Sequence, residues 1–100
     1  MKDKQYDFAA DKNHGLKENR HISFEEVIAA LEEGKLLEVV EHPNKIKYPN
    51  QNMYVLEIND YIYLVPFIQQ NEDSIFLKTI FRSRKATKSY RNRGNEHEKV

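Results

Sequence analysis

No cysteine occurs among the 100 residues of the chain, so neither a disulfide framework nor a thiolate zinc site can form. A chain without cysteine suits the reducing cytosol. No apolar run approaches the ~20 residues that a membrane-spanning helix needs. The first residues, MKDKQYDFAADK, also lack the apolar core of a secretion signal. We therefore expect a cytoplasmic protein that has no membrane partner.

Familiar catalytic motifs are absent as well. The sequence matches no phosphate-binding loop, nucleophile elbow or zinc motif. The histidines are too dispersed to predict a metal site, and we expect no cofactor. What is present is an ordinary domain composition, 39% hydrophobic and 32% charged, which is too apolar for a disordered chain. We expect one domain over residues 1–92 and a disordered tail over residues 93–100.

Charge is balanced in total but separated along the chain. The formal net charge is zero at pH 7. Carboxylates dominate residues 21–41, where the charged side chains are Glu25, Glu26, Glu32, Glu33, Glu38 and Glu41 against Lys35. Residues 74–94 contain no carboxylate, and their cations are Lys78, Arg82, Arg84, Lys85, Lys88, Arg91 and Arg93. Charge separated in this way either lets the basic end contact a polyanion such as nucleic acid, or reflects a solvated acidic helix face and a frayed basic tail.

Two helices are predicted in the first third of the chain. A short helix, weakened by Gly15, is expected within residues 11–22. The second begins at the N-cap Ser23, because Glu26 follows three residues later as in a capping box, and it ends at Gly34. Its apolar side chains share one helical face and are assigned to the core; they are Phe24, Val27, Ile28 and Leu31.

Strands flank these helices. Apolar and aromatic runs predict five of them, at residues 5–8, 36–41, 53–58, 61–67 and 75–82. Asn59-Asp60 fits a two-residue hairpin turn. Pro66 lacks a ladder donor, so it indicates an edge strand or a bulge.

The order of these elements predicts an α+β fold, in which one or two N-terminal helices pack on one face of an antiparallel sheet of four to five strands. The alternation along residues 75–82 predicts that Lys78 and Arg82 share one face of the sheet. We expect the other face of the sheet to stay partly open, lined by Tyr54, Tyr63, Lys78 and Arg82.

The cationic end of the chain can carry chemistry without a metal ion. Arginine and lysine bind phosphate, arginine through a fixed fork of donors, and tyrosines stack on unpaired bases. RNA cleavage uses the 2′-hydroxyl as nucleophile, a base to take its proton, and cations to stabilise the transition state. A lysine whose pKa is lowered by neighbouring cations, or a histidine, can serve as that base.

The segment RHISFEEV, four strands and the segment SRKATK together resemble the BrnT family of type II toxin–antitoxin toxins. The resemblance covers about residues 6–91. An aromatic-x-aromatic strand with Tyr6 and Phe8 is followed by Lys12, and Ser23-Phe24-Glu25-Glu26 matches the family's helix start. The closing signature, R-x-A-[ST], corresponds to Arg84, Ala86 and Thr87.

The resemblance implies a RelE-like fold and an endoribonuclease that inhibits translation. It also implies a ribbon-helix-helix antitoxin, which binds operator DNA in complex with the toxin. On this interpretation Arg84 stabilises the transition state or the phosphate, and the further catalytic candidates are Arg82, Lys85 and Lys88. The candidates for RNA binding are Lys78, Tyr63, Tyr90 and Arg91.

Two alternatives stay open. The chain could be a non-catalytic RNA- or protein-binding module of the same fold. The segment SRKATK could instead be structural: Ser83, Ala86 and Thr87 would end the last strand and begin a short helix. Arg84 would then bridge to an acidic residue of the helix at residues 23–33.

Overall fold

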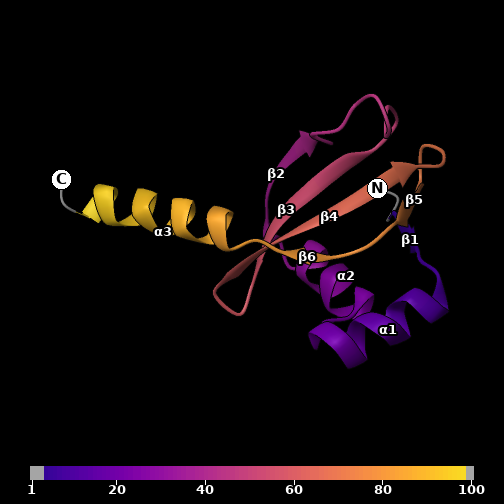
Figure 1. Cartoon of the computed structure of the whole chain (residues 1–100), viewed down its shortest axis with the longest axis horizontal. Coiled ribbons are helices and arrows are strands. Elements are labelled where there is room, and N and C mark those ends of the chain that lie inside the picture. Colours follow the sequence, from indigo (N-terminus) through magenta and orange to yellow (C-terminus); the bar gives the residue numbers. More distant parts are fainter. Residues whose placement is uncertain (1–3, 99–100) are drawn as a thin grey trace.

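The frame of the protein is one six-stranded sheet with the strand order β1-β5-β4-β3-β2, in which β6 also pairs with β4. The computed structural model describes residues 4–98, and side chains as far as residue 91. In chain order the elements are β1 (Gln5–Asp7), α1 (Ala10–Arg20), α2 (Phe24–Glu32), β2 (Leu36–Glu41), β3 (Asn52–Ile58), β4 (Tyr61–Gln69), β5 (Ser74–Leu77), β6 (Phe81–Arg82) and α3 (Arg84–Glu98). Figure 1 shows α1 and α2 beside the sheet and α3 extending away from it.

The α+β class and the two N-terminal helices are as predicted, but the sheet is mixed and has one more strand than expected. β1 pairs with β5 in parallel, whereas the remaining pairs are antiparallel. No short hairpin connects β1 to its neighbour, because both helices and three strands lie between them in sequence. A parallel pair requires a long connection of this kind between its two strands. No helix in the described part of the chain is long and apolar enough to cross a membrane.

Local sequence signals explain the ends of α2 and the β3–β4 hairpin. Ser23 and Glu26 form the complete capping box, since each side chain accepts a hydrogen bond from the other residue's backbone N–H. Gly34 follows the helix with a φ of 78°, a left-handed conformation that glycine adopts without strain. Asn59 and Asp60 have φ values of 53° and 69°, as a type I′ turn requires.

A buried asparagine joins the two N-terminal helices. Asn13 is 5% exposed, its Oδ1 accepts a 2.8 Å hydrogen bond from the backbone N–H of Phe24, and its Nδ2 donates to Glu25 at 2.8 Å. The N–H of Phe24 belongs to the first turn of α2, where no intrahelical acceptor exists. Asn13 therefore fixes the start of α2 against α1.

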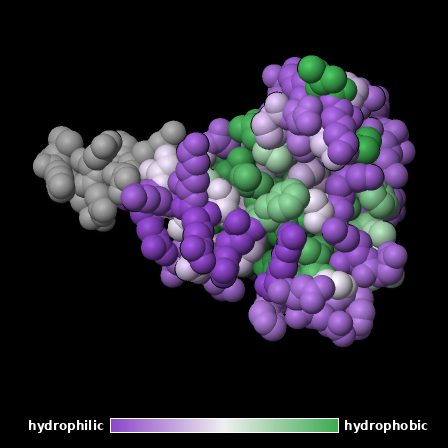
Figure 2. Space-filling model, in the orientation of Figure 1, coloured by the Kyte–Doolittle hydropathy of each residue, from purple (hydrophilic) through white to green (hydrophobic). Residues whose placement is uncertain are grey.

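The core lies between α1, α2 and one face of the sheet. Its helical members are Leu16, Phe24, Val27 and Ala30, and its strand members are Tyr54, Leu56, Tyr63, Val65, Phe67, Ile75 and Leu77, with Ile22 between the helices and Ile80 between strands. Tyr54 and Tyr63 were predicted to line the open face, and that prediction was wrong. Their register places them on the helix-covered face, where both side chains are buried. Figure 2 shows apolar side chains gathered over the middle of the molecule and hydrophilic ones around them.

The strand predicted at residues 75–82 is broken into β5 and β6. β4 advances three residues from Phe67 to Leu64, while the opposite chain advances four, from Leu77 to Phe81. One extra residue therefore enters the ladder as a bulge, and it reverses which side chains face the core. Ile80 becomes fully buried and Phe81 is 43% exposed, the opposite of the alternation predicted.

Pro66 lies beside this bulge. Its carbonyl accepts a 2.8 Å hydrogen bond from the N–H of Lys78, the residue that follows β5. Proline has no N–H with which to return a hydrogen bond to this segment, and the regular pairing of β5 with β4 ends here. Of the two expectations for Pro66, the bulge is confirmed; the edge is not, because β4 pairs on both sides. The bulge also separates Lys78 from Arg82. Arg82 pairs with Tyr63 on the helix-covered face, whereas Lys78 lies against Phe76, which pairs with Ile68 on the other face.

α3 is attached to the sheet through its first turn. Ser83 caps it, because its Oγ accepts from the N–H of Ala86 at 3.1 Å. Thr87 is 4% exposed; its Oγ1 accepts from the N–H of Ile62 at 2.9 Å and donates to the carbonyl of Ser83 at 2.7 Å. The helical backbone continues to Glu98, across most of the segment for which a disordered tail was predicted; residues 99–100 lie outside the described residues.

Candidate functional site

A basic hollow lies where the end of α1, β6 and the start of α3 meet. Its volume is about 820 Å³, and its lining residues are Asn19, Arg20, His21, Ile22, Tyr63, Ile80, Phe81, Arg82, Ser83, Arg84 and Lys85. Four of these are cations and one is a histidine. Among the side chains that the structure describes, no carboxylate lines the hollow. This arrangement favours an anion as ligand, because no described lining residue neutralises the positive charge of the four cations.

The wall from α1 is fixed by Arg20. Its Nη1 donates a 2.7 Å hydrogen bond to the backbone carbonyl of Ile80, and its guanidinium carbon lies 5.5 Å from the centroid of the Phe81 ring. The next residue, His21, ends α1 in a left-handed conformation with a φ of 56°. This turn leaves the imidazole exposed at the hollow.

Arg82 enters the hollow from β6. It stands opposite Tyr63 in the ladder, so both side chains lie on the helix-covered face of the sheet. Its guanidinium carbon is 4.8 Å from the centroid of the Tyr61 ring, a distance at which cation and ring attract each other. The aromatic contact holds the cation at the edge of the core.

Arg84 and Lys85 are the first two residues of α3, directly after the cap Ser83. The N-terminal end of a helix carries a partial positive charge, so cations there cost stability, about 0.3–1 kcal/mol each at exposed positions. The first turn of α3 contains no acidic residue that would offset this cost. Both the backbone and the side chains at this end of α3 therefore attract an anion.

The structural alternative for the segment SRKATK is half confirmed. Ser83 and Thr87 do end the strand region and begin α3. No ion pair joins Arg84 to an acidic residue within the part of the chain whose side chains are described. Arg84 is therefore not used to bridge α3 to α2.

The hollow brings together four of the eight site residues that were predicted, namely Tyr63, Arg82, Arg84 and Lys85. Tyr63 is only 9% exposed and belongs to the core, so its ring cannot stack on a base. Lys88 does not line the hollow, although it lies four residues after Arg84 and thus on the same side of α3. Lys78 lies on Phe76, with its Nζ 5.4 Å from the ring centroid.

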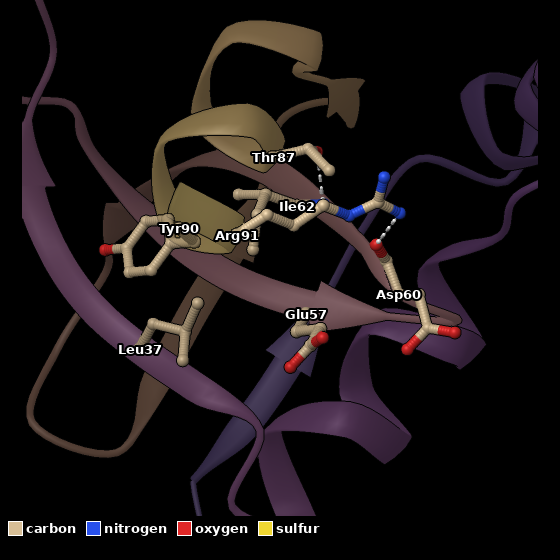
Figure 3. A pocket seen from close by; sticks show the side chains of 7 residues that line it. All are labelled: Leu37, Glu57, Asp60, Ile62, Thr87, Tyr90 and Arg91. Carbon is tan, nitrogen blue, oxygen red and sulfur yellow. Dashed lines mark hydrogen bonds between the residues drawn. The ribbon is translucent and has the colours of Figure 1, made fainter. Parts of the chain in front are cut away.

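Tyr90 and Arg91 line a different hollow of about 360 Å³, which is also lined by Glu57 and Asp60 (Figure 3). Arg91 donates from Nη2 to the backbone carbonyl of Asp60 at 3.2 Å, and the hydroxyl of Tyr90 donates to the carboxylate of Glu38. These contacts hold α3 on the sheet. With carboxylates in its lining, this second hollow is a poor site for a polyanion, and an RNA-binding role of Tyr90 and Arg91 stays a prediction.

Sequence reasoning did not assign Arg20, His21 and Phe81 to the site. Arg20 and His21 belong to a helix end some 60 residues before β6, and no local pattern connects the two segments. The only signal for Phe81 would have been the bulge opposite Pro66, which reverses the alternation. These three residues line the hollow together with the start of α3.

The shifted pKa values belong to groups outside the basic hollow. Burial, followed by the neighbouring Tyr6, raises the pKa of Tyr54 to about 12. Burial, followed by the charge of Glu32, raises the pKa of Tyr6. The hydrogen bond from Asn13 is the largest cause of the lowered pKa of Glu25. None of these three side chains lines the basic hollow.

No group of three or more histidine and carboxylate side chains that could hold a metal ion occurs within the described residues. Comparison with family models, with curated proteins and with solved structures finds no match to this chain. The resemblance to the BrnT toxins is therefore a prediction that the comparisons leave as it stands.

Proposed function

We propose that the chain binds RNA through the basic hollow and cleaves it as a metal-independent endoribonuclease. The observation that carries this proposal is the lining of the hollow: Arg20, Arg82, Arg84 and Lys85 surround it with His21, and no carboxylate among the described residues lines it. Arginine matches the geometry of phosphate oxygens. Backbone and sugar are common to all RNA, so this charge supplies affinity without sequence preference.

The reaction we propose is a transesterification within the RNA strand. The 2′-oxygen attacks the adjacent phosphorus, the bond to the 5′-oxygen breaks, and a 2′,3′-cyclic phosphate remains. His21 accepts the proton of the 2′-hydroxyl, since histidine is the side chain that most often acts as a general base and His21 is the histidine that lines the hollow. Arg84 and Arg82 stabilise the negative charge of the pentacoordinate transition state. The departing 5′-oxygen takes its proton from Lys85 or from solvent.

The biological role we propose is that of a toxin in a type II toxin–antitoxin system, active in the cytoplasm, where cleavage of RNA stops translation. Support comes from the resemblance of the chain to the BrnT toxins, whose signature residue Arg84 lines the hollow. A RelE-like fold, a ribbon-helix-helix antitoxin and operator binding through the antitoxin complex are parts of the same proposal. An antitoxin that neutralises the toxin would cover the cations that RNA needs.

A second candidate function is RNA binding without cleavage. It is favoured by the absence of any carboxylate in the described lining, because carboxylates are common general bases and none of the described lining residues supplies one. Affinity for RNA would be unchanged in such a module, and only turnover would be missing.

The experiment that tests the proposal is tightly controlled expression in a bacterial host, with wild type, Arg84→Ala and His21→Ala side by side. Lys47→Ala is the matched control, because Lys47 is a cation of the β2–β3 loop, outside the basic hollow. We expect wild type and Lys47→Ala to arrest growth and the other two variants, at equal soluble expression, to permit it.

Cleavage of a labelled RNA by the purified protein in EDTA then separates the two candidate functions. Cyclic-phosphate ends that depend on His21 support the ribonuclease. RNA binding without products, together with harmless expression, supports the non-catalytic module. Growth arrest that is the same for wild type and Arg84→Ala would refute the assigned site.

A further inference from the structure

An exposed aromatic ring stands at the basic hollow. Phe81 in β6 is 43% exposed, although burial of a phenylalanine ring is favourable. The bulge between β5 and β6 causes the exposure, because Ile80 occupies the buried position that Phe81 would otherwise take. Phe81 is thus the one large apolar side chain among the described residues that is both exposed and part of the hollow's lining.

Arg20 holds this ring in place. Its guanidinium lies 5.5 Å above the ring centroid and is itself fixed by the 2.7 Å hydrogen bond to the carbonyl of Ile80. By contrast, the exposed ring of Tyr61 has two guanidinium groups beside it, those of Arg82 and Arg91 at 4.8 and 5.8 Å. Among the side chains described as far as residue 91, Arg20 is the one guanidinium beside Phe81, and the 43% exposure of Phe81 leaves part of its ring accessible beside the cations.

A flat apolar ring next to phosphate-binding cations fits a ligand that has both a π-face and a phosphate. A nucleotide unit of a single strand has both, and bases stack on aromatic rings and on guanidinium planes. The bases of a duplex are already stacked within the helix and cannot reach the ring. A phosphate ion or a polyphosphate would bind the cations and leave Phe81 unused.

We propose that Phe81 and Arg20 form a stacking platform that makes the basic hollow selective for unpaired bases, so that its ligand is single-stranded RNA. This inference rests on the proposed function, because it takes for granted that the hollow binds RNA. The cations supply affinity for any RNA backbone, and the platform adds the preference for a strand whose bases are free.

Fluorescence anisotropy with three end-labelled 12-nucleotide probes tests the platform. The probes are 2′-O-methyl oligoadenylate, which cannot be cleaved, the same strand paired with its complement, and an abasic strand of the same length. The proteins are wild type, Phe81→Ala, Phe81→Leu and Phe81→Trp, each checked by circular dichroism. Leucine keeps the apolar volume of the side chain but has no π-face, so Phe81→Leu separates stacking from packing.

We expect wild type to bind the oligoadenylate about tenfold more tightly than the abasic strand. Tenfold corresponds to about 1.4 kcal/mol, within the range for one base on an aromatic ring. Phe81→Ala and Phe81→Leu should lose this preference, Phe81→Trp should keep it, and duplex binding should be the same in all four proteins. Phe81→Leu binding the single strand as wild type does, or equal affinity of wild type for the abasic strand, would overturn the platform. Failure of wild type to bind any of the three probes would overturn the proposed function itself.

Discussion

The attachment of α3 to the sheet gives the sharpest test of the fold, through the substitution Thr87→Val. Valine has nearly the same shape as threonine but no hydroxyl. In the native protein the Thr87 Oγ1 is the acceptor for the N–H of Ile62 at 2.9 Å. Thr87 and Ile62 are 4% and 3% exposed, so water cannot replace the lost acceptor.

The cost follows from which groups lose their partner. The carbonyl of Ser83 keeps a hydrogen bond from the backbone N–H of Thr87 at 3.0 Å, so it remains satisfied in the variant. Only the N–H of Ile62 is left buried without an acceptor, and such a group costs about 1–3 kcal/mol. A loss of about 2 kcal/mol, the middle of this range, lowers the melting temperature of a domain of this size by roughly 8–16 °C.

Thr87→Ser is the matched control, because it keeps the hydroxyl and removes one methyl group, at about 1 kcal/mol. Urea unfolding followed by circular dichroism gives the free energy of both variants. We expect Thr87→Val to be less stable than Thr87→Ser. If packing alone held α3, the order would be reversed, since valine preserves the volume and serine does not. That reversed order would refute the hydrogen-bond account of the α3 attachment.

Two further predictions concern local conformation and pH. Gly34→Ala should destabilise the protein by about 1 kcal/mol, since alanine is strained at a φ of 78°. Gly15→Ala should stabilise it by about 0.5–1 kcal/mol, because Gly15 lies inside α1. Neither added Cβ meets an atom within 4 Å, so backbone conformation alone decides the sign, and urea unfolding measures the free energy of both variants. The pKa of Glu25 is lowered in the folded state, chiefly by its hydrogen bond to Asn13, so this carboxylate contributes stability above its unfolded pKa, and the contribution is lost as pH falls through the folded pKa. Unfolding free energies measured from pH 7 to pH 3 should therefore fall less steeply in Glu25→Gln, and equal slopes would contradict the shift.

The features that were predicted correctly from the sequence are those that depend on residues close together in the chain. The capping box of Ser23 and Glu26 and the left-handed stop at Gly34 each depend on residues within one or two turns. The same holds for the hairpin turn at Asn59-Asp60. Side-chain and backbone chemistry over so short a span decides the local conformation almost independently of the rest of the chain.

The features that were missed depend on contacts between distant segments. The bulge between Leu77 and Phe81 arises from how that segment pairs with β4 beside Pro66, and a shift of one residue reverses every side chain after it. The contact of Arg20 with Ile80 joins residues 60 positions apart. No pattern near Arg20 indicates that the end of α1 forms a wall of the basic hollow.

The substitution Arg84→Glu separates the two accounts of the cationic end. If the cations at the start of α3 served the fold, their removal would destabilise the protein. Arg84 is the first residue of α3, where the opposite is expected. A carboxylate at a helix N-terminus stabilises the helix by about 0.3–1 kcal/mol, and a cation there destabilises it. Arg84 also has no ion pair among the described side chains that its loss would break. We therefore expect Arg84→Glu to unfold at an equal or higher urea concentration than wild type and yet to bind single-stranded RNA at least tenfold more weakly. A variant that loses stability and keeps its RNA affinity would show that the charge serves the fold, and the basic hollow would then need another explanation.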